Sequence, residues 1–114
     1  MSRKFSHKPR QSEIFLGQKL KQLRNSIEMT QLELGKKTND LSQQIDRYEA
    51  GAFIPLPKLE ELAEALGTRI PKKIIRKIST ERKLEVETAS ERNEQLIGLY
   101  SLAFDGANDN REDE

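Results

Sequence analysis

The sequence predicts an all-α fold of five helices followed by an additional C-terminal helix. Apolar residues recur every three or four positions in successive segments of the chain, which is the spacing of one helix face. Ser or Thr stands near the start of several segments, and Gly or Pro stands near their ends. The 114 residues suffice for one small domain with an appendage, because two separate cores in a chain of this length would be marginal.

The first predicted helix covers residues 13–27, with Ser12 as its N-cap. Its apolar face consists of Leu16, Leu20, Leu23 and Ile27. Arg24 borders this buried face, where an unpaired charge would be costly. We therefore predict an internal ion pair between Arg24 and Glu49.

The stretch from Thr30 to Gly51 predicts two short helices joined by a tight turn. Thr30 and Glu33 form a capping-box pattern at the start of the first of them. Asn39 tolerates the left-handed backbone of a helix end, which places the turn there. The second helix covers residues 41–50. Its outer face carries Ser42, Gln43, Gln44, Asp46 and Arg47. Such a short, polar helix adds little to a core, so we expect it to contact a partner.

Two further helices follow a proline-containing linker. Pro55 and Pro57 argue against regular helix in the linker, so the fourth helix is predicted over residues 58–66, with Gly67 ending it. A fifth helix is predicted over residues 72–78. Its outer face is basic and comprises Lys72, Lys73, Arg76 and Lys77.

The last predicted helix covers residues 88–104 and follows a charged stretch, residues 79–87, that is either a linker or a poorly anchored helix. Its C-terminal half concentrates apolar side chains, namely Leu96, Ile97, Leu99, Tyr100, Leu102, Ala103 and Phe104. A lone solvated helix does not expose so much apolar surface. This helix is therefore expected to pack on the domain, on a second copy of itself or on another protein.

Charge is distributed unevenly along the chain. Residues 1–77 contain 16 Lys and Arg against 9 Asp and Glu, whereas residues 78–114 contain 4 against 10. The resulting net charges, +7 and −6, indicate a polyanion-binding part and a second part with another task. The predicted organisation is a flexible basic arm, a helical domain, a linker with the C-terminal helix and a disordered acidic tail, covering residues 1–11, 12–78, 79–104 and 105–114.

Several classes of function lack the residues they need. The chain has no cysteine and one histidine, His7, so we expect no metal site and no cofactor. It has no Ser-His-Asp set and no phosphate-binding glycine loop, so we do not expect an enzyme. No apolar run approaches the length of a membrane span, and no secretory signal follows the N-terminus. A cytoplasmic protein without membrane contact is expected.

The residue types in these helices resemble the Cro/C1-type helix-turn-helix family, also called XRE regulators. The resemblance covers about residues 15–78 and rests on Leu16, Gly17, Leu20, Leu23, Arg24, Thr30, Gln31, Leu34, Ile45, Tyr48, Glu49, Gly51, Leu62, Ala63, Leu66 and Gly67. It implies a five-helix lambda-repressor-like DNA-binding domain. It also implies the pair of Arg24 with Glu49, in agreement with the argument from burial.

The resemblance further implies that the third helix reads bases in the major groove. The implied base-contacting residues are Ser42, Gln43, Gln44, Asp46 and Arg47, and the implied phosphate-contacting residues are Gln31, Leu41, Gly51 and Lys58. Gln and Arg suit base reading because they can make two hydrogen bonds to the edges of adenine and guanine, respectively. Asp46 would accept a hydrogen bond from cytosine or hold Arg47 in position.

The chain departs from the family around the turn. The dipeptide Thr38-Asn39 replaces an apolar residue followed by glycine, and Leu41 replaces a small cap residue. The cap of the third helix is therefore expected at Asp40 or Ser42, and the base-contacting positions can shift by one residue.

These observations lead to the expectation of a sequence-specific transcriptional regulator that binds double-stranded DNA at a palindromic operator as a homodimer. The predicted dimer interface in the C-terminal helix comprises Leu96, Leu99, Tyr100, Ala103 and Phe104. The fourth and fifth helices, around Phe53 and Ile54, are the alternative dimer surface. Another class of function remains open, a protein-interaction module such as an antiactivator or an antitoxin that binds its partner through the C-terminal helix.

Overall fold

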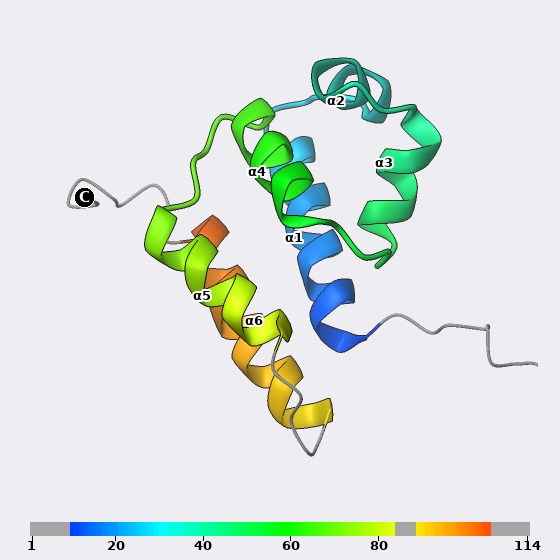
Figure 1. Cartoon of the computed structure of the whole chain (residues 1–114). Coiled ribbons are helices and arrows are strands. Elements are labelled where there is room, and N and C mark those ends of the chain that lie inside the picture. Colours follow the sequence, from blue (N-terminus) through cyan, green and yellow to red (C-terminus); the bar gives the residue numbers. More distant parts are fainter. Residues whose placement is uncertain (1–9, 84–88, 106–114) are drawn as a thin grey trace, which may run out of the picture.

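The structure is all-α over the residues that the computed structural model describes, 10–83 and 89–105. These residues form α1 (Gln11–Ser26), α2 (Gln31–Thr38), α3 (Ser42–Glu49), α4 (Leu56–Ala65), α5 (Lys72–Lys83) and α6 (Ala89–Asp105). In Figure 1, α1 runs through the middle of the molecule, with α3 on one side and the hairpin of α5 and α6 on the other. The predictions for residues 1–9, 84–88 and 106–114 lie outside the described residues.

The first helix begins earlier than predicted. Its N-cap is Arg10, whose backbone N–H donates to the Glu13 carboxylate at 3.0 Å, and Gln11 is its first residue. Ser12 is buried within the first turn, and its backbone N–H donates to Oδ1 of Asn93 in α6 at 3.1 Å. The prediction of Ser12 as the cap was wrong because α6 covers this turn and supplies a hydrogen-bond acceptor for it.

The start of α2 and the turn that ends it form as predicted, whereas the N-cap of α3 differs. The Thr30 hydroxyl accepts from the backbone N–H of Glu33 at 3.0 Å, and the Glu33 carboxylate accepts from the N–H of Thr30 at 2.9 Å. Asn39 adopts the left-handed conformation that ends α2, with φ 65° and ψ 36°. The N-cap of α3 is Leu41, without a side-chain cap, and neither Asp40 nor Ser42 takes this position.

The fourth helix also begins before its predicted start. Its first residue is Leu56, and Pro57 lies in its first turn. The prediction that Pro57 excludes helix was wrong, because first-turn amides have no acceptor within the helix and the missing N–H of proline costs nothing there. Gly67, with φ +86°, follows the end of the helix as predicted.

The fifth helix continues to Lys83, so residues 79–83 are helical and the predicted domain boundary at residue 78 falls inside α5. Near its end, Arg82 donates from Nε to the Tyr100 hydroxyl at 3.0 Å and from Nη1 to the Ile54 carbonyl at 2.8 Å. Its guanidinium also lies 4.6 Å from the centre of the Phe53 ring. Burial raises the pKa of Tyr100, and the nearby charge of Arg82 opposes this rise. Arg82 therefore ties α5 both to α6 and to the linker between α3 and α4.

The apolar side chains of α6 belong to the core of the protomer itself. The helix packs against α1 and α5, and one apolar cluster joins residues from all six helices. The five side chains predicted to form the dimer interface, Leu96, Leu99, Tyr100, Ala103 and Phe104, are all buried in that cluster. These five side chains therefore have packing partners within the protomer, and their part in a dimer interface stays a prediction.

A glycine sets the distance between α1 and α3. A Cβ atom added to Gly17 would lie 2.5 Å from the carbonyl oxygen of Tyr48 and 2.6 Å from that of Glu49. Both oxygens are backbone atoms and cannot move independently of α3. The two helices can therefore make this contact only if residue 17 has no side chain.

We expect Gly17→Ala to lower the free energy of unfolding by about 1–3 kcal/mol, because the added methyl group forces α3 away from α1. Gly98→Ala is the matched control in α6, since nothing lies within 4 Å of its added Cβ. That change is expected to stabilise the protein by about 0.5–1 kcal/mol through helix propensity. Urea unfolding measures both values, and equal effects of the two changes would contradict the close contact.

A second pair of variants tests whether α6 is part of the protomer core. Leu96→Ala is expected to cost about 2–5 kcal/mol of unfolding free energy, because Leu96 is buried. Leu102→Ala on the same helix is expected to change it by less than about 0.5 kcal/mol, because Leu102 is 54% exposed. The loss in Leu96→Ala should not depend on protein concentration. A loss that disappears at high concentration would show instead that α6 is stabilised by a second copy.

Candidate nucleic-acid interface

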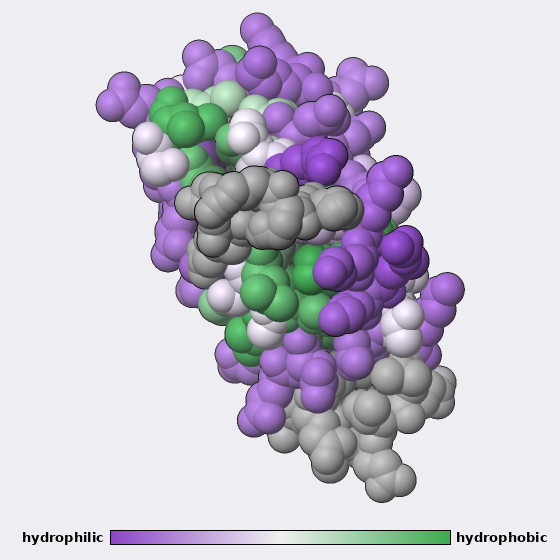
Figure 2. All heavy atoms as spheres, turned by 90° about the vertical axis from the view of Figure 1, so that its left-hand side faces the viewer, coloured by the Kyte–Doolittle hydropathy of each residue, from purple (hydrophilic) through white to green (hydrophobic). Residues whose placement is uncertain are grey.

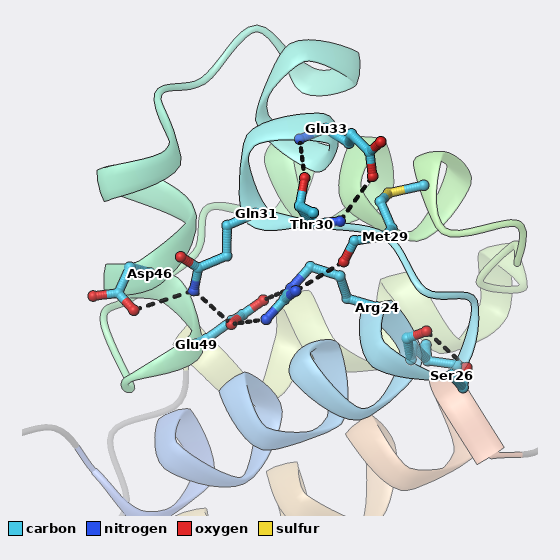
Figure 3. A network of polar contacts seen from close by, with 9 residues as sticks. Arg24, Ser26, Met29, Thr30, Gln31, Glu33, Asp46 and Glu49 are labelled. Carbon is cyan, nitrogen blue, oxygen red and sulfur yellow. Dashed lines mark hydrogen bonds and ion pairs between the residues drawn. The ribbon is translucent and has the colours of Figure 1, made fainter.

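A buried ion pair joins the end of α1 to the end of α3. Nε of Arg24 donates to Oε2 of Glu49 at 2.6 Å, and Nη2 donates to Oε1 at 3.0 Å. Nη1 of Arg24 also donates to the carbonyl oxygen of Met29, at 2.8 Å, in the segment that leads into α2. The hydrogen bond to Glu49 raises the pKa of Arg24. The predicted pair is therefore present, and it fixes α1, α3 and the start of α2 to one another (Figure 3).

Gln31 extends this network to the outside of α3. Its side-chain amide nitrogen donates to Oε1 of Glu49 at 3.0 Å and to Oδ1 of Asp46 at 3.1 Å. In Figure 3, Gln31 lies between the two carboxylates, with its amide oxygen directed away from them. Gln31 was predicted to contact DNA phosphate, and in the structure its amide nitrogen joins α2 to α3. The sequence did not reveal this contact, because 15 and 18 residues separate the partners.

The outer face of α3 contains the side chains predicted to read bases. Gln43, Asp46 and Arg47 are exposed, and Ser42 and Gln44 are half-buried. Asp46 is held by Gln31 rather than by Arg47. Within the described part of the chain, Gln43 and Arg47 make no side-chain hydrogen bond or ion pair. Because these two residues are four positions apart, they lie one turn apart on the same face of the helix. The structure therefore brings together an amide and a guanidinium that are both available to a partner.

Two of the predicted phosphate contacts, at the two ends of α3, differ in their surroundings. The backbone N–H of Gly51 donates to the carbonyl of Tyr48 at 3.1 Å, and Gly51 is buried. This N–H closes the end of α3 and is not available to a phosphate. Leu41, by contrast, is 73% exposed at the start of α3. Its carbonyl accepts from the N–H groups of Gln44 and Ile45.

Lys58, another predicted phosphate contact, makes structural contacts within the protein. Its ammonium donates to the Thr38 carbonyl at 2.8 Å and to Glu61 at 2.7 Å, and it lies 3.1 Å from the Asp40 carboxylate. The hydrogen bond to Glu61 raises the pKa of Lys58. An ammonium group has three donors, so these three acceptors satisfy it. Lys58 thus holds α4 against the turn between α2 and α3.

Comparisons of the chain with protein-family models, with curated proteins and with solved structures find no match. None of the helices within residues 10–83 and 89–105 has both the length and the apolar composition to cross a membrane.

The energetics of the Arg24–Glu49 pair can be separated from its geometry with three variants. Arg24→Met alone leaves the Glu49 carboxylate buried without its cation, and we expect this to cost about 3–5 kcal/mol of unfolding free energy. Arg24→Met combined with Glu49→Leu is expected to cost less, because no charge is left unpaired. Lys21→Met, an exposed position on the same helix, is the control for loss of a cation from α1. Urea unfolding measures all three, and a double variant less stable than Arg24→Met would refute this account.

Proposed function

We propose that the chain is a sequence-specific DNA-binding transcriptional regulator of the Cro/C1 type, acting in the cytoplasm as a homodimer on a palindromic operator. In this proposal α2 and α3 form the helix-turn-helix, and α3 enters the major groove. The observation that carries the proposal is the outer face of α3. Gln43 and Arg47 stand there exposed and, among the described residues, without internal partners, on a helix that is otherwise fixed by a buried polar network.

The chemistry of this face suits base reading. The Gln43 amide can donate to and accept from adenine, and the Arg47 guanidinium can donate twice to guanine. Asp46 can accept from cytosine while Gln31 holds its carboxylate in place. The first backbone N–H groups of α3 and the positive end of its dipole favour a nearby phosphate. Positional precision matters for such contacts, and the network that binds α3 to α1 and α2 supplies it.

A single copy of α3 reads only a few base pairs, so the proposal includes two copies on half-sites about 34 Å apart. The buried residues of α6 offer little surface to a second copy in this fold. On the alternative surface, Ile54 is also buried, whereas Phe53 is 55% exposed. Phe53 in the linker and Leu102 on α6 are the exposed apolar side chains that remain from the two predicted dimer regions.

The alternative function, a protein-interaction module, has less support than the sequence suggested. It relied on an apolar C-terminal helix that was free to bind a partner. In the structure most of the apolar side chains of this helix pack inside the protomer. A free polar face on α3 favours the DNA-binding proposal.

The proposal is tested by selecting bound sequences from a random duplex pool with the wild type, Arg47→Ala and Lys21→Ala. The wild type should enrich a palindromic site. Arg47→Ala should lose about 1–3 kcal/mol of discrimination at one base pair of each half-site. Lys21 is an exposed cation on α1, so Lys21→Ala should keep the selectivity of the wild type. Absence of binding by the wild type at low salt, or unchanged selectivity in Arg47→Ala, would refute the proposal.

A further inference from the structure

The outer face of α5 carries a second group of positive charges that the proposed function does not use. Lys72, Lys73, Arg76 and Lys77 are all exposed, within two turns of one helix. Among the side chains that the structure describes, none offers these four a hydrogen bond or an ion pair. Figure 2 looks onto the side of the molecule that carries α5, and hydrophilic side chains surround a smaller hydrophobic area there. Four cations this close together repel one another unless an anion lies near them.

This basic face of α5, defined by these four residues, is separate from the outer face of α3. The two helices lie on opposite sides of α1 in Figure 1. A duplex that receives α3 therefore does not lie along α5. A duplex bound to α3 thus leaves the basic face of α5 open to another anion.

The chain itself carries a suitable anion at its C-terminal end. Residues 106–114 read GANDNREDE, and contain four carboxylates and one arginine, for a net charge of −3. They begin immediately after α6, which packs against α5. The helices are joined by a short connection and form an antiparallel hairpin, so the end of α6 is brought beside the start of α5. In the middle of this hairpin, Arg76 and Lys77 of α5 line the same groove as Gln95 and Leu99 of α6.

Residues 106–114 are long enough to reach the basic face of α5. Nine extended residues span at most about 30 Å, whereas the turns of α5 from residue 72 to residue 77 rise by only about 8 Å. A segment tethered so close to its binding face has an effective concentration in the millimolar range. Association of this kind needs no strong individual contact.

We propose that residues 106–114 bind the basic face of α5 in the same chain, as an internal polyanion. The carboxylates are those of Asp109, Glu112, Asp113 and Glu114. The contact removes four free cations from the surface, so this side of the protein no longer attracts nucleic acid. If the proposed function is correct, binding to DNA is then left to α3. The inference does not require that the proposed DNA-binding function is correct.

The test is acetylation of lysine side chains by a succinimidyl ester, followed site by site with mass spectrometry. The wild type is compared with a full-length variant that carries Asp109→Asn, Glu112→Gln, Asp113→Asn and Glu114→Gln. At low salt, Lys72, Lys73 and Lys77 should react about threefold more slowly in the wild type than in the variant. At about 0.5 M salt the difference should vanish, because the charges are screened. Lys36 and Lys37, exposed on α2, are the internal controls and should react equally in both proteins.

Each other outcome overturns the proposal. Equal rates at the three α5 lysines would mean that residues 106–114 do not bind there. An equal change at Lys36 and Lys37 would indicate a general effect of net charge. Protection that increases with protein concentration would assign the contact to a second copy. Protection of the α5 lysines that appears only on addition of a random-sequence duplex would make this face a DNA-binding surface. A failure of the proposed function is recognised separately, as absence of duplex binding by both proteins.

Discussion

The buried pair of Arg24 and Glu49 is the interaction on which the arrangement of the helices depends. It joins residues 25 positions apart at the ends of α1 and α3, and the same carboxylate accepts from Gln31 of α2. Removing two charges from water is costly, so the net contribution of such a pair to stability is small even when its geometry is good. The pair instead fixes the relative orientation of α1 and α3. Its two parallel hydrogen bonds allow only one relative placement of the two side chains, and an apolar contact in the same place would tolerate sliding.

The close contact at Gly17 acts together with this pair. The glycine lets α3 approach α1, and the ion pair fixes its orientation once it is there. Lys58 holds the opposite end of α3, its start, by joining α4 to the turn before it. These three contacts surround α3, although α3 itself buries few apolar side chains. A short helix with a weak hydrophobic face is thereby held firmly enough to present free polar groups at fixed positions.

The sequence predicted those features whose causes are local or concern a single charge. Thr30 and Glu33 lie within one turn of each other, Asn39 marks its own backbone conformation, and a cation beside a buried stripe requires a carboxylate. The sequence did not predict features that arise from packing between distant segments. The early start of α1, the extension of α5 and the position of Lys58 each involve a hydrogen bond to a group in a distant segment of the chain.

The apolar surface of α6 is the clearest case of a feature whose partner the sequence alone does not determine. Its composition required a partner surface, and three kinds of partner were consistent with it, of which a second copy was predicted. Only the three-dimensional contacts with α1 and α5 distinguish packing within the protomer from association with a second chain. The base-contacting residues on α3 remain predictions. Gln43 and Arg47 are exposed and, among the described residues, make no internal side-chain hydrogen bond, which fits that role. Which bases they select depends on hydrogen bonds to DNA.

The continuity of α5 through residues 79–83 has a mechanical consequence for the proposed dimer. Since α5 is tied to α6 and to the α3–α4 linker by Arg82, a dimer surface at Phe53 or at Leu102 is rigidly connected to α3. Two copies that meet through such a surface hold their α3 helices at one separation and one relative rotation. Each inserted base pair lengthens the duplex by about 3.4 Å and rotates the second half-site by about 34°, since one turn takes about 10.5 base pairs. The protein would therefore measure the distance between half-sites as well as their sequence.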